Sequence, residues 1–208
     1  MNNAPIELYA ANSSNSQRVA IMLEVCGLPY AVHKVDLSRG EQRSDAFLAM
    51  NPAGAVPVIV DPDAAGGSLT LTQSGAILLY LAMKTGRHFP QDPRLRATAF
   101  QWFMFATTDF SSFSTMLFLT NMILPDKSSA NARFFEERLS RYLMIANARL
   151  ESRAFLADEL SIADFAMYPV VRARYDLVEH AAKLPHLVRW AEALAARPGV
   201  SRGMAATG

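Results

Sequence analysis

The chain has 208 residues, half of them apolar, and its 20 basic and 19 acidic residues leave a formal net charge of +1. This length suits one large domain or two small ones around a substantial buried core. There is no basic stripe, and the longest apolar runs, Ala76–Met83 and Ile162–Val171, fall short of the roughly 18 residues of a membrane span. We therefore expect neither nucleic acid nor a membrane as a partner.

The cysteine and histidine content argues against a metal site. A single cysteine excludes an internal disulfide and a cysteine metal cluster. The four histidines show no ligand-like grouping with each other or with acids; they are His33, His88, His180 and His186. Residues 1–5 lack the basic and apolar regions of a signal peptide. These features predict a cytoplasmic globular protein without metal.

The chain begins with a strand followed by a capped helix. Residues 6–9 alternate apolar and polar side chains, which predicts a short strand. Residues 12–16 are five consecutive small polar residues, and each is a good helix N-cap. Apolar residues then recur at helical spacing from Val19 to Cys26, and Gly27 supplies a stop. Since one cap satisfies one helix start, the other polar residues either serve a ligand at the positive end of the helix or form an ordinary loop.

The next elements complete a mixed domain. Residues 29–36 predict a second strand, 38–42 a polar loop, and Ala46, Phe47 and Met50 a short helix. Two strands at 58–60 and 69–71, joined by a hairpin loop, precede a helix that opens at Ser74. The order β-α-β-α-β-β-α within residues 1–84 predicts an α/β domain with a thioredoxin-like fold.

A corner at residues 51–57 precedes the third predicted strand. It places two prolines and one glycine within seven residues, and Pro57 takes the first strand position, one of the few that a sheet allows to proline. Because proline has no N–H, the backbone of Val56 is left to face outward. The Val56–Pro57 bond is either cis or trans, and these residues alone leave both open.

The second part of the chain is helical. Residues 85–93 have the composition of a linker, and 94–208 form the second predicted domain. A stretch at 94–123 is rich in Phe, Met and Leu, and a helical stripe follows from Phe135 to Leu150. Ser161 and Asp164 form a capping box before a helix that is apolar nearly all round, which predicts a central place in the bundle. Pro185 opens a last helix, which Pro198 and Gly199 end.

Three ordered pieces give the chain a resemblance to the glutathione transferase superfamily along nearly its whole length. They are the corner at 51–57, the segment 71–81 (Leu-Thr-Gln-Ser-Gly-Ala-Ile-Leu-Leu-Tyr-Leu) and Ser161-Ile162-Ala163-Asp164. The resemblance implies a thioredoxin-like domain followed by an all-α bundle, and a cis bond before Pro57. The loop before the first helix looks most like bacterial Nu- or Theta-like classes that use a serine or threonine with an asparagine two places on.

The resemblance implies that Ser13 activates the thiol of glutathione, assisted by Asn15. The thiolate is the nucleophile, and a hydroxyl that donates to it lowers the thiol pKa. Ser14 takes this role if the loop is shifted by one residue. Some classes use a tyrosine near position 9, but Tyr9 lies inside a predicted strand, which favours packing.

Further residues are expected to bind glutathione by resemblance. Gln73 and Ser74 would bind the γ-glutamyl end, and Val56 and Pro57 the cysteinyl part. Gln42 matches a position that contacts the glycyl end, with Arg43 beside it as a source of charge. Relatives carry a basic residue where this chain has Ala55, which weakens the expected glycyl contact.

A second-substrate pocket is expected between the loop at 12–16 and the helix covering 100–124, with Phe103 and Phe110 in its lining. Cys26 lies on the apolar face of the first helix, which favours a core role. Beta-class relatives carry a catalytic cysteine where this chain has Asn15, so a mixed disulfide with a protein thiol is disfavoured.

The first functional hypothesis is a homodimeric glutathione transferase that conjugates glutathione, its co-substrate, to electrophilic apolar compounds. A glutathione-dependent disulfide reductase or peroxidase is the second, because two bound glutathiones need no protein thiol. A non-catalytic binding protein on the same fold is the third.

Overall fold

The computed structural model describes residues 4–174, 176–177 and 184–208; the segment 1–3 and His180, used above, lie outside this range. The chain forms two compact units, one made of Met1–Arg87 with Ala196–Gly208 and the other of His88–Ala195. The domain boundaries drawn from the sequence, 1–84 and 94–208, stay a prediction.

The first unit is built on a four-stranded mixed sheet. Its strands are β1 (Ile6–Ala10), β2 (Tyr30–Lys34), β3 (Val58–Asp61) and β4 (Leu69–Thr72), in the spatial order β2-β1-β3-β4. β1 pairs parallel with β2 and antiparallel with β3, and β3 pairs antiparallel with β4. A crossover helix has to join the parallel pair, while a short loop joins β3 to β4.

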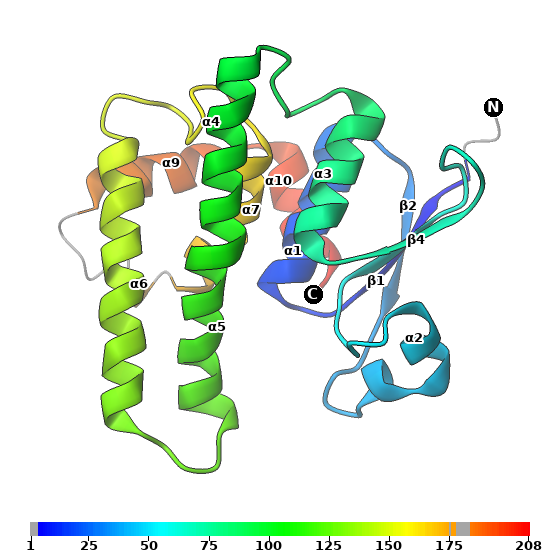
Figure 1. Cartoon of the computed structure of the whole chain (residues 1–208), viewed down its shortest axis with the longest axis horizontal. Helices are drawn as coiled ribbons and strands as arrows, with labels where there is room; N and C mark the ends of the chain where they lie inside the picture. Colours follow the sequence, from blue (N-terminus) through cyan, green and yellow to red (C-terminus); the bar gives the residue numbers. More distant parts are fainter. Residues whose placement is uncertain (1–3, 175, 178–183) are drawn as a thin grey trace. The chain divides into compact units, whose positions relative to one another are not determined.

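Helices cover both faces of this sheet (Figure 1). α1 (Ser14–Cys26) and α3 (Ser74–Thr85) pack together on one face, and α2 (Asp45–Met50) lies on the other after a 3-10 turn at Glu41–Arg43. Leu8 and Ile59 are fully buried between the sheet and its helices. The observed order confirms the predicted thioredoxin-like fold.

A C-terminal helix, α10 (Pro198–Ala206), packs against α1. Arg202 pairs with Glu24 of α1 at 2.6 Å, and Gly203 lies directly against the backbone of Ile21. The helix that Pro185 opens ends at Ala195, before Pro198 and Gly199 as the sequence predicts, but the expectation that it is the last helix was wrong. A proline at the first helical position costs no hydrogen bond, so Pro198 begins a helix instead.

The second unit is a helical bundle with a long interrupted helix. α4 (Pro93–Met104) and α5 (Ser111–Phe118) are joined by a π-helical segment at Phe105–Phe110 and followed by another at Leu119–Ile123. The Ser111 hydroxyl donates to the Ala106 carbonyl at 2.6 Å, five residues back. α6 (Ser129–Arg149) packs beside α5 (Figure 1).

α7 (Ile162–Ala173) is the buried centre of this bundle. Its predicted capping box is confirmed, because the Ser161 side chain accepts from the Ala163 N–H and Asp164 accepts from the Ser161 N–H. Asp164 also accepts from the Trp190 ring N–H of α9 (Pro185–Ala195) at 2.9 Å. One carboxylate thus joins the start of α7 to the last helix of the unit.

Candidate glutathione site

The sheet register brings three of the predicted site segments to one end of the first unit. β3 pairs Val58 with Tyr9 near the end of β1, and β4 pairs Thr72 with the same Val58. The residues that follow β1, precede β3 and follow β4 therefore lie at the same sheet end. These are residues 12–16, which include the N-cap and first turn of α1, the corner at 51–57 and the start of α3.

Ser13 is the N-cap of α1. Its Oγ accepts from the Ser16 N–H at 3.3 Å, and its hydroxyl donates to Ser16 Oγ at 3.1 Å. The buried Ser16 Oγ also accepts from the Ala11 N–H at 3.3 Å. The Ser13 hydrogen can therefore turn to another acceptor while Ser16 keeps one donor. No acidic residue occupies the first turn of α1, so its positive end carries no side-chain counter-charge.

The start of α3 is uncapped. Its N-cap residue, Gln73, makes no side-chain capping bond, and the first turn holds no acid. Gln73 is exposed and has a φ of +68°, a left-handed conformation that costs a non-glycine residue energy. Within the part of the chain that the structure describes, the N–H groups of Ser74 and Gly75 have no hydrogen-bond partner. Free N–H groups at a helix start are suited to a carboxylate.

The first turns of α1 and α3 are joined by a short hydrogen-bond chain. Arg18 Nη1 lies 3.4 Å from Ser74 Oγ, and Ser74 Oγ lies 3.4 Å from Asn15 Oδ1. Arg18 is fully buried, and burial lowers its pKa to about 10. Arg18 was not among the site residues predicted from the sequence; the available signal was a basic residue among the buried positions of an amphipathic helix.

The corner at 51–57 is held by a buried asparagine. Asn51 Nδ2 donates to the Ala55 carbonyl at 2.6 Å, and Asn51 Oδ1 accepts from the Ala53 N–H at 3.2 Å. The Val56–Pro57 peptide bond is cis, which confirms the expectation from the resemblance. Among the described residues, the N–H and carbonyl of Val56 have no partner, so they are available to an extended peptide.

Gln42 lies beside this corner. Gly54 packs against the Gln42 backbone, since a Cβ there would lie 3.2 Å from the Gln42 carbonyl oxygen. The side-chain oxygen of Gln42 is buried and has no partner among the described residues. Arg43 and Ala55 are both exposed.

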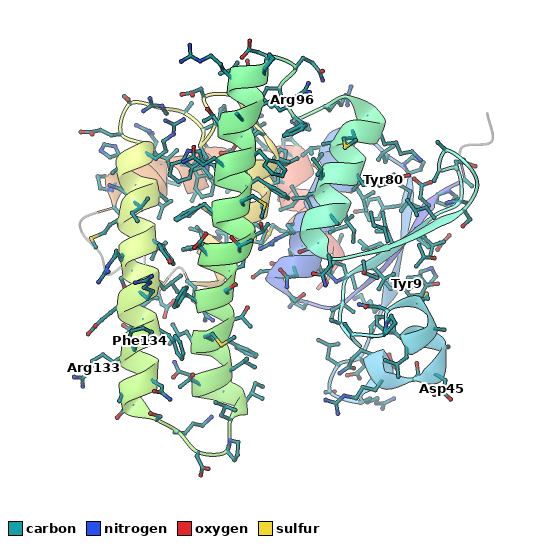
Figure 2. The ribbon with its side chains drawn as sticks, in the orientation of Figure 1. Tyr9, Asp45, Tyr80, Arg96, Arg133 and Phe134 are labelled. Carbon is teal, nitrogen blue, oxygen red and sulfur yellow. The ribbon has the colours of Figure 1, made fainter. Side chains whose placement is uncertain are left out.

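Cys26 and Tyr9 lie outside this group. Cys26 is buried at the last position of α1, where its sulfur lies 3.4 Å from Thr85 Oγ1 and burial raises its pKa. Tyr9, which Figure 2 labels, stacks on His33 with ring centroids 4.6 Å apart and packs over the Val35, Phe47 and Val58 cluster. Both core roles favoured by the sequence are confirmed.

The two predicted pocket residues of the helical unit are buried. Phe103 is 4% exposed and Phe110 is fully covered, so neither presents surface to a second substrate in this conformation. That they share a pocket with the loop at 12–16 stays a prediction.

A groove of about 760 Å³ follows α6 and contains none of the predicted site residues. Arg133 and the neighbouring Phe134 project from this helix (Figure 2). The lining comes from α6 alone and consists of Ser129, Ala132, Arg133, Glu136, Glu137, Ser140, Arg141 and Met144.

No group of three His, Cys, Asp or Glu residues suited to a metal ion occurs among the described residues. In that same part of the chain, no helix is both long and apolar enough to cross a membrane.

Comparison with known proteins gives matches over nearly the whole chain. The family models for the N-terminal and C-terminal domains of glutathione S-transferase match residues 12–84 and 108–198. The disulfide-bond oxidoreductase YfcG of Escherichia coli is 34% identical over 206 residues, which cover 96% of this chain and 94% of the relative.

Two crystal structures of glutathione transferases are similar in fold. One, from Pseudomonas putida, has one glutathione disulfide bound per subunit; it is 30% identical, covers 98% of this chain and 92% of its own, and has a TM-score of 0.92. The other, from Burkholderia graminis, has two glutathione molecules bound per subunit; it is 35% identical, covers 96% and 87%, and has a TM-score of 0.90.

Proposed function

Because the chain belongs to the glutathione S-transferase family, we propose that it reduces disulfide bonds with two molecules of glutathione. The position of Cys26 carries this proposal. α1 has 13 residues, so roughly 20 Å of helix separates Cys26 from the Ser13 end at 1.5 Å per residue. A buried cysteine with a raised pKa is a poor nucleophile, so the exchange has to run between thiols that the enzyme binds.

The similar proteins support this order of hypotheses. One relative is named a disulfide-bond oxidoreductase, and the two similar structures hold either two glutathiones or their disulfide. Two reduced molecules and one oxidised pair are the reactants and product that such a cycle requires. We therefore place disulfide reduction ahead of conjugation, the first hypothesis from the sequence.

The proposed reaction has two exchange steps. The thiolate of the first glutathione attacks one sulfur of the substrate, forming a mixed disulfide and releasing a substrate thiolate, which takes a proton. The thiolate of the second glutathione attacks the glutathione sulfur of that mixed disulfide. The second substrate thiol leaves, and glutathione disulfide forms. Two thiols supply both electrons, so no other reductant is required.

Ser13 is the proposed activating residue, as the resemblance of its loop to the Ser/Thr-Asn type implies. Lowering a thiol pKa by two units requires about 2.7 kcal/mol of preferential thiolate binding. A charge-assisted hydrogen bond contributes about 1.5–3 kcal/mol. The positive end of α1 adds about 0.3–1 kcal/mol. These contributions are sufficient without deprotonating the serine.

The other predicted residues would bind the tripeptide backbone. The γ-glutamyl carboxylate fits the uncapped start of α3 at Ser74, with Gln73 accepting from the ammonium group. The cysteinyl part would pair with the free backbone of Val56 before Pro57. Gln42 lies where the resemblance places the glycyl end, and its buried oxygen can accept from an N–H of the ligand.

Conjugation to an electrophile is the second candidate function. The same thiolate would attack carbon instead of sulfur. Apolar side chains exposed along α4 and α5 favour this candidate because they offer contact area to an apolar substrate. These residues are Phe100, Met104, Met116 and Phe118.

We also propose that the protein is cytoplasmic and forms a homodimer. A reductase of this type draws on a reduced glutathione pool, which fits a cytoplasmic protein. The homodimer is what the resemblance implies, and light scattering that gives a monomer mass would refute it.

The deciding experiment compares two assays on one preparation. Reduction of 2-hydroxyethyl disulfide by glutathione is followed through NADPH and glutathione reductase, and conjugation is followed with 1-chloro-2,4-dinitrobenzene. We expect disulfide reduction well above the uncatalysed rate. Arene turnover without disulfide turnover would favour the second candidate. Neither activity, together with no retention on immobilised glutathione, would favour a non-catalytic protein.

A further inference from the structure

We propose that Arg18 is a positioning residue of this site, which fixes the direction of a hydrogen-bond chain so that Asn15 presents N–H donors to the sulfur of glutathione. This inference rests on the proposed function, because it concerns how the site stabilises a glutathione thiolate. The chain has two links, from Arg18 to Ser74 and from Ser74 to Asn15, each 3.4 Å long.

The direction of both links follows from the groups involved. A guanidinium has donors and no acceptor, so Ser74 Oγ has to accept from Arg18. The Ser74 hydroxyl has one hydrogen, which it can then donate to Asn15 Oδ1. In this arrangement Arg18 donates, Ser74 accepts and donates, and Asn15 accepts. Arg18 favours this direction because its buried positive charge attracts the oxygen of the Asn15 amide and repels the amide N–H groups.

These bonds determine how the side-chain amide of Asn15 is oriented. Its carboxamide oxygen faces Ser74, so the amide nitrogen with its two N–H donors lies on the opposite side of the group. Asn15 is exposed in the first turn of α1, and its Nδ2 has no partner among the described residues. If the amide were flipped, its oxygen would face an incoming thiolate and repel it.

The burial of Arg18 keeps it in place as a charged donor. Arg18 is 1% exposed and is one of the largest fully buried side chains. Its pKa of about 10 leaves it protonated at neutral pH, so it stays a donor throughout the working range. A buried charge is also screened less by water and salt than a charge on the surface.

The test measures the thiol pKa of bound glutathione from thiolate ultraviolet absorbance as the pH is varied. Arg18→Met removes the donor but keeps an unbranched side chain, and Arg18→Lys keeps a charged donor. Ser74→Ala breaks the second link. Arg202→Met is the matched control, because Arg202 contacts α1 through Glu24, in the helix half away from this site. Circular dichroism and the affinity for S-methylglutathione, which has no ionisable thiol, are measured on each variant.

We expect Arg18→Met to raise the bound thiol pKa by about one unit and Arg18→Lys to stay within about 0.3 unit of wild type. The S-methylglutathione affinity of Arg18→Met should change less than its glutathione affinity. The bound thiol pKa of the double variant Arg18→Met/Ser74→Ala should be no higher than that of Ser74→Ala alone, because both changes break the same hydrogen-bond chain.

A folded Arg18→Met with the wild-type thiol pKa would overturn the inference and leave the proposed function standing. If Arg18→Met does not fold, Ser74→Ala decides: a raised thiol pKa supports the chain of bonds, and an unchanged value refutes it. If wild type itself does not lower the thiol pKa, the inference and the proposed function both fail.

Discussion

Ser74 Oγ, at the start of α3, lies 3.4 Å from Asn15 Oδ1, in the first turn of α1. The two residues are 59 positions apart in the chain, and their contact joins the positive ends of two helices. Because neither first turn contains an acid, the positive potentials of the two helix N-termini are not neutralised by a side chain and add in the same region. A ligand with one carboxylate and one thiolate meets a favourable field for each group.

Ser13→Ala should lower the rate of disulfide reduction at least about tenfold, which corresponds to about 1.4 kcal/mol of lost thiolate stabilisation. The same change removes the N-cap of α1 and costs about 1 kcal/mol of folding stability. Ser128→Ala is the matched control, since Ser128 caps α6 in the same way. Both variants should show similar losses in urea unfolding, and Ser128→Ala should keep full activity. Equal rates for the two variants would remove Ser13 from the mechanism.

Asp61 predicts a pH dependence of stability. Burial raises the pKa of its carboxyl, but hydrogen bonds from Lys84, Tyr80 and the Asp63 N–H outweigh burial and lower it. A pKa that is lower in the folded state stabilises the fold above the unfolded value, near 3.9, and this stability is lost as the pH falls below it.

The Asp61 prediction is checked by urea unfolding between neutral pH and about pH 3. Asp61→Asn should be less stable than wild type at pH 7, and the difference should shrink as the pH falls. The exposed Asp126→Asn should follow the wild-type curve. A constant difference between Asp61→Asn and wild type at all pH values would contradict this assignment.

Gly203→Ala should destabilise the packing of α10 on α1. An added Cβ would lie 2.4 Å from Ile21 Cα, which is backbone and cannot rotate away. Overpacking of this kind costs about 1–3 kcal/mol, sometimes more. Ser201→Ala, at an exposed position of the same helix, should change thermal unfolding little. Equal midpoints for the two variants would show that α10 does not pack this way.

Asp164→Ala should be among the most destabilising single changes. The carboxylate accepts from the N–H groups of Leu156 and Ser161 and from the Trp190 ring, all buried. Each unsatisfied buried donor costs about 1–3 kcal/mol. Asp158→Asn, which weakens the partly exposed pairs with Arg149 and Arg153 and tolerates the φ of +67° at this position, should cost no more than about 1 kcal/mol. Comparable losses in urea unfolding would refute the role given to Asp164.

Much of the fold could be predicted because its signals are local. The helical spacing from Val19 to Cys26 with the Gly27 stop predicted α1, and the Ser161–Asp164 box predicted the start of α7. The start of α10 was missed because proline and glycine commonly follow the end of a helix, while proline is also favoured at the first position of one.

The site could be predicted only in part, because contacts between residues far apart in the sequence hold it together. Nothing near residue 15 in the sequence indicates Ser74 as its neighbour; the pairing of β1, β3 and β4 produces that contact. The buried Arg18 follows from the same assembly, as does the bracing of the corner by Asn51. Burial of Phe103 and Phe110 depends on the packing of the bundle, which the sequence of a stretch so rich in Phe, Met and Leu does not specify.

The most direct test of the central claim is the rate of Cys26→Ala in glutathione-dependent reduction of 2-hydroxyethyl disulfide. Since two bound glutathiones carry the exchange, the variant should keep the wild-type kcat and KM, and intact-mass analysis of wild type during turnover should show no glutathione attached to the protein. A variant without activity, or a wild-type protein that carries one glutathione on Cys26, would contradict the account.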